Sequence, residues 1–367
     1  MNNLKFENEV LSKLFKDKNI TDISFNGNDI YIQDNKKGRY KLNEPVNPKD
    51  IDDYIKQLTY ESNKEFNNEE PILNLDYPGL RVSALHKSIS PYGTTASLRI
   101  SLPELKIKNE EELATKELFN LLKACIKSQS NILISGKTGS GKTELQKLLI
   151  KYINDTDKIV LIEDTLDTHL KEIYPKKDIL SWKINEMTDK KIDFDDLIKA
   201  SLRNNPDWIL ISEVRGSEAY SMLKSALSGH HIITTLHSNN SKNNIERLIH
   251  LCKEKYDLEQ ILLGKMISDI FDLGIHVDYD ISDKGIKRFI VDVVEYLGYD
   301  ESGIKYNTIF KREIKIKKVG NEFEYVPTFF YGKISEKLFQ KLLNNKCLND
   351  DIMKFIDKEV IEKYEEN

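Results

Sequence analysis

The middle of the chain alternates short, almost wholly apolar runs with longer amphipathic stretches. Four runs carry this pattern: NILISG (131–136), KIVLIED (158–164), WILISE (208–213) and HIITTLH (231–237). Strands that lack a regular polar face are typical of parallel sheets covered by helices on both sides. The pattern therefore predicts a doubly wound α/β domain over residues 105–300.

The flanking regions instead alternate apolar and polar positions with a period of two, as half-buried strands do. Residues 1–104 are expected to form a smaller α+β domain, with helices over 4–15 and 50–67 and strands over 20–27, 29–35, 81–86 and 96–100. Residues 301–367 are expected to form a β/α extension of unknown role, with strands over 306–319 and 322–330 and a helical run over 335–363. A linker is expected at 101–108, where Pro103 breaks the pattern.

Composition places the chain among globular proteins. It has 367 residues, 39% of them hydrophobic and 31% charged. No apolar run reaches the roughly 18 residues of a membrane span, and the amino end lacks a signal-peptide core, so we expect a cytoplasmic protein. The three cysteines form neither a disulfide framework nor a zinc motif. The net charge of −5 argues against stable nucleic-acid binding, and the basic run 309–318 is interpreted as the solvated face of an edge strand.

A glycine-rich loop follows the first apolar run of the central domain. It reads GKTGSGKT and fits G-x-x-x-x-G-K-[ST] at every fixed position. Its glycines allow backbone N–H groups to converge on phosphate oxygens, and the helix that follows attracts anions at its first turn. Lys142 would reach the β- and γ-phosphates, and the Thr143 hydroxyl would ligate Mg²⁺. We expect ATP and Mg²⁺ to bind here, contacted by Gly136, Lys137, Thr138, Gly139, Ser140, Gly141, Lys142, Thr143 and Glu144.

Polar side chains stand at the ends of the next apolar runs. Glu163 and Asp164 end the second run, Glu213 ends the third and His237 ends the fourth. Ligands of open α/β sheets bind at the carboxyl ends of the strands. Glu163 could therefore activate a water, Glu213 could hold Mg²⁺ through water and His237 could sense the γ-phosphate. The alternatives are carboxylates that cap the next helices and a histidine that serves as a structural hydrogen-bond partner.

These motifs, in this order, resemble the traffic ATPases of bacterial secretion, specifically the VirB11-like branch of type IV secretion and conjugation ATPases. The resemblance covers about residues 5–300 and rests on GKTGSGKT, LIEDTLD, LRNNPDWILISEVRGSEA and GHHIITTLHSNN. It implies a RecA-like P-loop domain behind a smaller α+β domain. It also implies that Glu163 is the water-activating carboxylate, Glu213 the Walker B acid and His237 the histidine-box residue, with Arg215 among the family's arginines around Walker B.

The amino-terminal region adds to the resemblance. The segments LRVSA (80–84) and SLRI (97–100) are similar to the family's amino-terminal signature, whose arginines reach nucleotide across a domain or subunit boundary. Arg99 and then Arg81 are the candidates, because an arginine supplied in this way stabilises charge on the transferring phosphoryl group. The alternative for each is a surface salt bridge. The sequence departs from the family at Asp167, where a second Glu is usual, and at Ser212 and Glu144.

The resemblance implies a homo-hexameric motor whose partners are the inner-membrane components of a secretion or conjugation channel, including a coupling protein. A motor for pilus or type II secretion assembly is a second interpretation, although the four-cysteine zinc element of many type II motors is missing from the sequence. A nucleotide-binding regulator with little turnover is a third. A DNA helicase is a fourth, without an aromatic and basic strand-binding segment to support it. Peripheral contact with the inner face of the cell membrane is left open.

Overall fold

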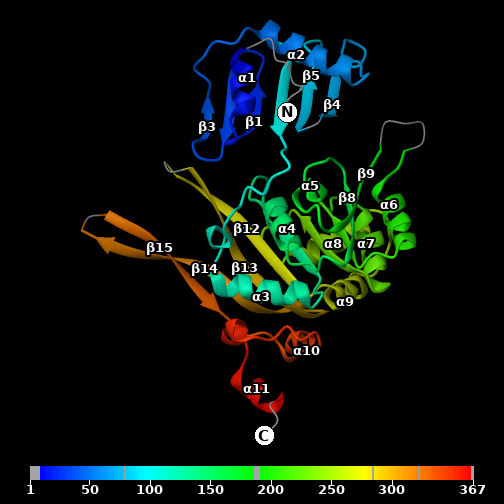
Figure 1. Ribbon diagram of the computed structural model, residues 1–367, viewed down its shortest axis with the longest axis vertical. Coiled ribbons are helices and arrows are strands. Elements are labelled where there is room, and N and C mark those ends of the chain that lie inside the picture. Colours follow the sequence, from blue (N-terminus) through cyan, green and yellow to red (C-terminus); the bar gives the residue numbers. More distant parts are fainter. Residues whose placement is uncertain (1–8, 78, 186–190, 283–284, 321, 365–367) are drawn as a thin grey trace. The chain divides into compact units, whose positions relative to one another are not determined.

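The computed structural model describes residues 9–77, 79–185, 191–282, 285–320 and 322–364. Contacts divide the chain into two compact units (Figure 1). The first unit comprises Met1–Glu104, Thr165–His169 and Asp280–Lys287, and the second comprises Leu105–Asp164, Leu170–Tyr279 and Arg288–Asn367. Among the described residues, no helix is long and apolar enough to cross a membrane.

The first unit is built on a six-stranded antiparallel sheet in the order β3-β2-β1-β6-β5-β4. Its strands are β1 (Ile20–Phe25), β2 (Ile30–Asp34), β3 (Gly38–Lys41), β4 (Ile72–Tyr77), β5 (Leu80–Leu85) and β6 (Thr95–Ile100). Apolar side chains that alternate along these strands pack with helices α1 (Glu9–Lys16) and α2 (Pro48–Glu61) in one core. The predicted α+β pattern is confirmed, although β3 and β4 were not predicted, and residues 4–8 of the predicted first helix lie outside the described residues.

The second unit contains a nine-stranded sheet in the order β15-β14-β13-β12-β7-β11-β10-β8-β9. Its strands are β7 (Ile132–Ser135), β8 (Lys158–Glu163), β9 (Asp178–Lys183), β10 (Trp208–Ile211), β11 (His231–Leu236), β12 (Leu273–Ser282), β13 (Gly285–Asp300), β14 (Gly303–Val319) and β15 (Glu322–Tyr331). Pairing is parallel throughout the run β12-β7-β11-β10-β8-β9. The predicted mostly parallel sheet is therefore confirmed, and the β14–β15 hairpin extends it in antiparallel fashion.

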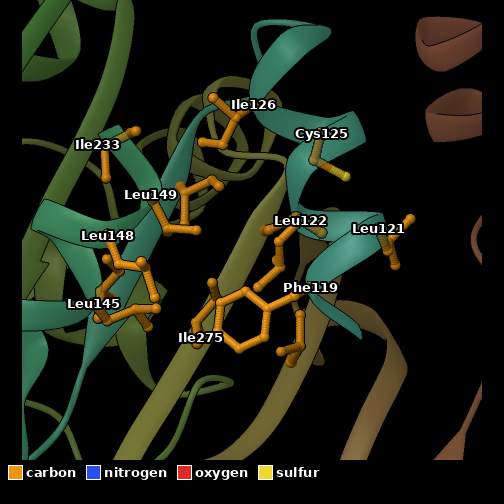
Figure 2. Packing of buried hydrophobic residues seen from close by; sticks show 14 of the residues in the cluster. Phe119, Leu121, Leu122, Cys125, Ile126, Leu145, Leu148, Leu149, Ile233 and Ile275 are labelled. Atoms are coloured by element: carbon orange, nitrogen blue, oxygen red, sulfur yellow. The ribbon is translucent and has the colours of Figure 1, made fainter. Parts of the chain in front are cut away.

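Helices cover both faces of the central parallel strands, which explains why β7, β8, β10 and β11 are almost wholly apolar. The helices of this unit are α3 (Lys116–Lys127), α4 (Lys142–Ile150), α5 (Leu170–Ile173), α6 (Phe194–Ser201), α7 (Glu218–Leu227), α8 (Asn244–Lys253), α9 (Gln260–Ile270), α10 (Glu336–Asn344) and α11 (Lys358–Tyr364), with 3-10 turns at Glu110–Glu112, Leu202–Asn204 and Asp350–Phe355. One face packs on α3 and α4, where Phe119 and Leu122 meet Leu145 and Leu149 (Figure 2). The other face packs on α6 to α9.

The carboxyl-terminal region belongs to the second unit by its contacts. The strands β14 and β15 agree closely with the predicted strands over 306–319 and 322–330. The predicted helical run over 335–363 is wrong as a single helix, because Lys346 has a positive φ of 56° and the chain then makes a 3-10 turn. Side chains of α10 and of this turn, such as Leu342 and Phe355, are buried in the same core as α3.

Two polar contacts fix the start and the middle of α10. The hydroxyl of Ser335 accepts a hydrogen bond from the Leu338 amide and caps the helix. The backbone N–H of Ser335 donates to Glu295 Oε2 on β13 at 2.8 Å, and its hydroxyl donates to the other carboxylate oxygen. Further along, Lys341 Nζ lies 2.7 Å from Asp272 Oδ2. Burial raises the pKa of Glu295, and the hydrogen bonds from Ser335 only partly offset this effect.

Substituting Glu295→Gln tests this buried carboxyl. Because its pKa is higher in the folded protein than in the unfolded chain, the unfolded chain loses its proton first, and stability falls as pH rises from about 4.5 through the folded-state pKa. An amide has no charge to bury and keeps an oxygen that can accept from Ser335. We expect Glu295→Gln to match the wild type in acid and to exceed it by roughly 1 kcal/mol in unfolding free energy at neutral pH.

Urea unfolding monitored across pH measures this difference, and Glu359→Gln, at the exposed first turn of α11, is the control. A difference between wild type and Glu295→Gln that stays constant from acid to neutral pH would contradict the assignment.

Candidate functional site

The glycine-rich loop connects β7 to α4 at the carboxyl edge of the parallel sheet. Gly136, Gly139 and Gly141 have φ values of 156°, 79° and 95°, a region that other residues rarely adopt. A side chain at Gly136 would overlap the Val277 carbonyl and the Ser140 hydroxyl. The loop therefore has a backbone that only glycine accommodates at these positions, and it places several N–H groups before the first turn of α4.

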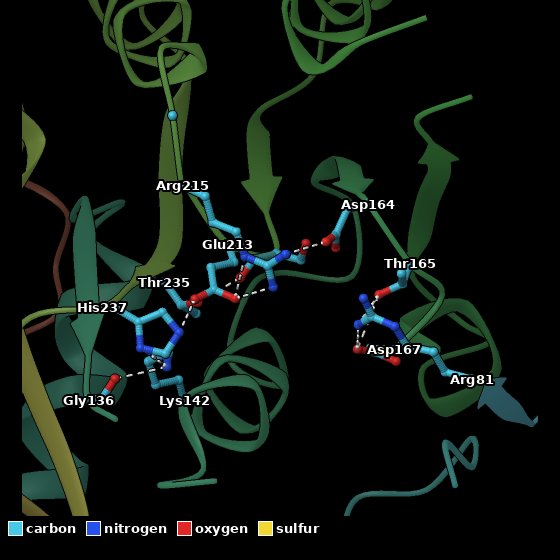
Figure 3. Close-up of polar contacts among 12 residues, drawn as sticks. Arg81, Gly136, Lys142, Asp164, Thr165, Asp167, Glu213, Arg215, Thr235 and His237 are labelled. Atoms are coloured by element: carbon cyan, nitrogen blue, oxygen red, sulfur yellow. Dashed lines mark hydrogen bonds and ion pairs between the residues drawn. The ribbon is translucent and has the colours of Figure 1, made fainter. Parts of the chain in front are cut away.

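Lys142 begins α4 and folds its side chain back over the loop. Its Nζ donates to the Gly136 carbonyl at 2.9 Å and lies 3.3 Å from His237 Nδ1 (Figure 3). The residue is only 7% exposed. Burial lowers the pKa of Lys142, Glu213 opposes this shift, and Arg215 adds to it. A bound anion would favour the charged ammonium at this position.

A row of polar and charged side chains continues from Lys142 along the strand ends. His237 Nε2 lies 2.8 Å from Glu213 Oε1, and Arg215 donates to Glu213 Oε2 at 2.7 Å. The same guanidinium reaches Asp164 Oδ2 at 2.7 Å (Figure 3). The structure thus brings together Lys142, His237, Glu213 and Arg215, all of which the sequence had selected.

Glu163 ends β8 beside the strand that precedes Glu213. It is 1% exposed, and Ile162 pairs directly with Ile211 of β10. The Ser212 amide donates to the Ile162 carbonyl, so the two strands remain paired up to the point where the acids emerge. This register places Glu163 and Glu213 at neighbouring ends of the sheet.

The remaining loop residues differ in their surroundings. Thr138 is exposed, and Thr143 is half-buried in the first turn of α4. The Ser140 hydroxyl is fully buried and has no hydrogen-bond partner among the described residues. Lys137 Nζ lies 2.8 Å from Asp278 and 4.4 Å from the centre of the Tyr279 ring.

Glu144 has a structural environment. Its carboxylate accepts from Lys147 Nζ at 2.9 Å and from the Lys106 amide at 2.9 Å. Lys147 is itself buried and pairs with Glu144 within α4, and the hydrogen bond from the Lys106 amide holds the segment before α3 against this helix. The predicted contact between Glu144 and nucleotide stays a prediction.

Two residues of the site were missed from the sequence. Arg288 of β13 donates through Nε to the Gly139 carbonyl at 3.0 Å, and its side chain covers Gly141. Gln146 of α4 donates to the carbonyls of Ile211 and Ile233, which fixes the helix against β10 and β11. Neither residue belongs to a motif, and β13 itself was not predicted, so no sequence signal marked Arg288.

The two candidate arginines of the amino-terminal region lie in the first unit with their own partners. Arg99 Nε lies 2.9 Å from Asp22 Oδ1. Arg81 lies 3.4 Å from Thr165 Oγ1 and 3.9 Å from Asp167 Oδ2 (Figure 3). Both therefore make the salt bridges that were the alternative interpretation, and any role toward phosphate stays a prediction.

Comparison with known proteins yields one consistent family. The family model described as "Type II/IV secretion system protein" matches residues 73–271. An uncharacterized protein of Bacillus anthracis, pXO2-25, is 34% identical over 365 residues, which is 96% of this chain and 79% of that protein. Protein VirB11 of Rhizobium radiobacter is 30% identical over 218 residues, and the match covers 55% of this chain and 61% of VirB11.

The crystal structure of the pilus retraction motor PilT with bound ADP has the same fold. It superposes with a TM-score of 0.56 over 97% of this chain and 92% of PilT, at 18% sequence identity. The predicted fold, a RecA-like domain with a smaller amino-terminal domain, is confirmed by this likeness.

Alanine at two loop glycines separates backbone strain from packing. A Cβ at Gly139 would meet open space, whereas one at Gly141 would lie 2.9 Å from Arg288 Cδ. Both positions have positive φ, so each Gly→Ala change costs about 1–2 kcal/mol of backbone strain. We expect Gly141→Ala to lower the unfolding free energy by about 1 kcal/mol more than Gly139→Ala, because Arg288 must also move.

Thermal unfolding measures this difference, and the double variant Gly141→Ala/Arg288→Ala is the control. Two results would contradict the packing of Arg288 on the loop. One is an equal loss of stability for the two glycine variants. The other is a cost of Gly141→Ala that is as large in the Arg288→Ala background as in the wild type.

Proposed function

Because the chain belongs to the type II/IV secretion system protein family, we propose that it is a Mg-dependent ATPase that powers a type IV secretion or conjugation system. The observation that supports this function most directly is the grouping of Lys142, His237 and Glu213 beside the glycine loop. The relatives named VirB11 support the choice of a type IV system, and the ADP in the PilT structure supports an adenine nucleotide.

The residues of the loop fit a nucleotide polyphosphate. The positive-φ glycines present backbone N–H groups, and the buried Ser140 hydroxyl offers one more donor. The Lys142 ammonium is buried beside the same loop. Lys142 would hold the β- and γ-phosphates, and Thr143 with Glu213 would hold Mg²⁺, which neutralises the phosphate charge.

Hydrolysis requires a group that positions water, and Glu163 is the proposed residue. It is a buried carboxylate on the strand next to Glu213, and burial fixes its side chain. Glu163 would orient the water and accept its proton. His237, placed between Lys142 and Glu213, would respond to charge at the γ-phosphate position through either neighbour. Arg215 would hold Glu213 and Asp164 in their present orientation.

We further propose that the active form is a homo-hexamer in which Arg99 and Arg81 reach nucleotide. An arginine that arrives only on closure would couple hydrolysis to movement. In this proposal the hexamer works at the inner face of the cell membrane with channel components that include a coupling protein. A motor for pilus or type II secretion assembly would use the same residues.

A low-turnover regulator is the second candidate, and two observations favour it. Glu213 already accepts from Arg215 and lies beside His237, so Mg²⁺ must compete with both for this carboxylate. Asp167, the shorter acid of the acidic box, accepts from Thr165 Oγ1 at 3.2 Å. In this case ATP would bind and be released with little hydrolysis.

Phosphate release from Mg-ATP tests the function. We expect Lys142→Ala to abolish nucleotide binding and Glu163→Gln to keep binding while lowering kcat by about 10²–10⁴-fold, since it removes a general base. The control is Glu172→Gln, the same change at an exposed position of the same unit, which should leave kcat unchanged. Wild-type protein that binds ATP yet releases no more phosphate than Lys142→Ala would instead support the regulator.

The role of Arg99 is tested by comparison with its own ion-pair partner. Asp22→Ala breaks the same salt bridge without removing the guanidinium. If Arg99 acts on phosphate in an assembled ring, Arg99→Ala should lower kcat by at least about tenfold while Asp22→Ala leaves it near the wild-type value. Specific activity of the wild type should also rise with protein concentration. Equal effects of the two variants would assign Arg99 to structure alone.

A further inference from the structure

The hairpin of β14 and β15 is amphipathic, and its apolar face is exposed. In the register, Ile314 is opposite Pro327, Ile316 is opposite Tyr325 and Lys318 is opposite Phe323. Paired residues of antiparallel strands point to the same face, and successive residues point to opposite faces. One face, here called the ribbon face, therefore carries these apolar residues: Ile314, Ile316, Phe323, Tyr325, Pro327 and Phe329.

The β14–β15 hairpin extends beyond the helices that cover the sheet (Figure 1). At its base Phe310 is fully buried and stacks on Phe329, with ring centroids 5.7 Å apart. Further out the side chains are open, with Ile316 at 64%, Tyr325 at 70% and Phe323 at 58% exposed. A contiguous exposed patch of this kind marks a surface that is covered in use.

Charge differs between the two faces of the hairpin. The opposite face holds three cations and three acids together with Val319, Val326, Thr328 and Phe330; its charged residues are Lys311, Lys315, Lys317, Glu313, Glu322 and Glu324. Over residues 311–319 and 322–330 the ribbon face holds Arg312 and Lys318 and no acid. Arg312 lies along the Phe289 ring, 3.8 Å from its centre. The ribbon face is therefore apolar and cationic, whereas the opposite face is balanced in charge.

These features argue against two possible occupants. A second copy facing the first through the same surface would bring the two Lys318 side chains toward a face that holds no acid over residues 311–319 and 322–330. A partner strand could also be added along β15, the edge strand of the sheet. It would meet Pro327, whose nitrogen has no hydrogen to donate and, within a paired strand, must lie on the unpaired side of β15, so one hydrogen bond of the new pair could not form. The occupant must instead cover the face, tolerate apolar side chains and carry negative charge.

We propose that the ribbon face docks on an anionic lipid surface. Aromatic side chains such as Tyr325 and Phe323 suit the boundary between headgroups and acyl chains, and the exposed Lys318 would pair with lipid phosphates. The balanced opposite face stays in water, as in other amphipathic elements that lie along a membrane. The inference rests on the proposed function only for the presence of a membrane nearby, and nucleotide has no part in it.

Vesicle flotation of the full-length protein without nucleotide tests the proposal. The probes are vesicles of phosphatidylcholine alone and of phosphatidylcholine mixed with an equal part of phosphatidylglycerol. We expect the wild type to float with the mixed vesicles and less with the neutral ones. Ile316→Glu should abolish flotation, and Val326→Glu, the same kind of change on the opposite exposed face, should retain it.

A second matched pair isolates charge. Lys318→Ala should weaken partitioning to anionic vesicles about fivefold, because each cation near an anionic surface contributes about this factor, while Lys317→Ala on the opposite face changes it less. Thermal unfolding midpoints equal to that of the wild type establish that the variants are folded.

Three results would overturn the proposal: no flotation with either vesicle, equal loss for Ile316→Glu and Val326→Glu, or self-association that depends on Ile316 without lipid binding. Because the assay contains no ATP, loss of vesicle binding with intact phosphate release would reject the lipid surface and leave the ATPase proposal standing.

Discussion

The parallel pairing of β7, β11, β10 and β8 is the constraint on which the site depends. Each pair is in direct register, so Ser135 of β7 is opposite Leu236 of β11, and Ile211 of β10 is opposite Ile162 of β8. Residues that follow these strands must then emerge at one edge of the sheet, although they lie far apart in sequence. Burial of every side chain in β7 and β10 by helices on both faces maintains this register, because a slip would move the apolar sets out of the core. Gln146 of α4 also holds these strands together, because its side chain donates to carbonyls of both β10 and β11.

The charges at this edge are arranged so that each has a neighbour of opposite sign or a polar contact. Lys142 reaches a loop carbonyl and His237, and Glu213 lies between His237 and Arg215. Lys142 is the buried member of this row, and a buried charge left without its partners is expensive. The burial that lowers the pKa of Lys142 also favours anion binding. Glu213 only partly compensates the buried ammonium, and a bound anion would add negative charge beside it. The resting contacts of Lys142 with loop carbonyls are therefore ones that a phosphate can replace.

Sequence reasoning succeeded where one interaction dominated. The strands β7, β8, β10 and β11 were predicted because burial on both faces leaves an unbroken apolar run, and the loop was predicted because positive φ demands glycine. It failed where context decides. The strand β9, DILSWK, mixes polar and apolar residues at the sheet edge, and β13 contains Glu295 and Asp292, whose partners come from distant segments. The loop contact of Arg288 depends on a strand pairing that no local pattern encodes. Glu144 directly follows the motif, yet its carboxylate accepts hydrogen bonds from Lys147 and from the Lys106 amide.

The strand β13, which was not predicted, contacts three parts of the second unit. Along one strand, Arg288 contacts the Gly139 carbonyl, Glu295 binds the amide that begins α10, and Val293 pairs with Phe310 at the base of the β14–β15 hairpin. The glycine-rich loop, α10 and the β14–β15 hairpin are therefore all attached to one strand, β13. The region after residue 300 was expected to be a β/α extension, and its first strand continues the sheet through this pairing. The apolar side chains of β14 pack against the core at the base of the hairpin but are exposed further out. The same period-two pattern therefore gives a buried Phe310 and an exposed Ile316 only six residues apart.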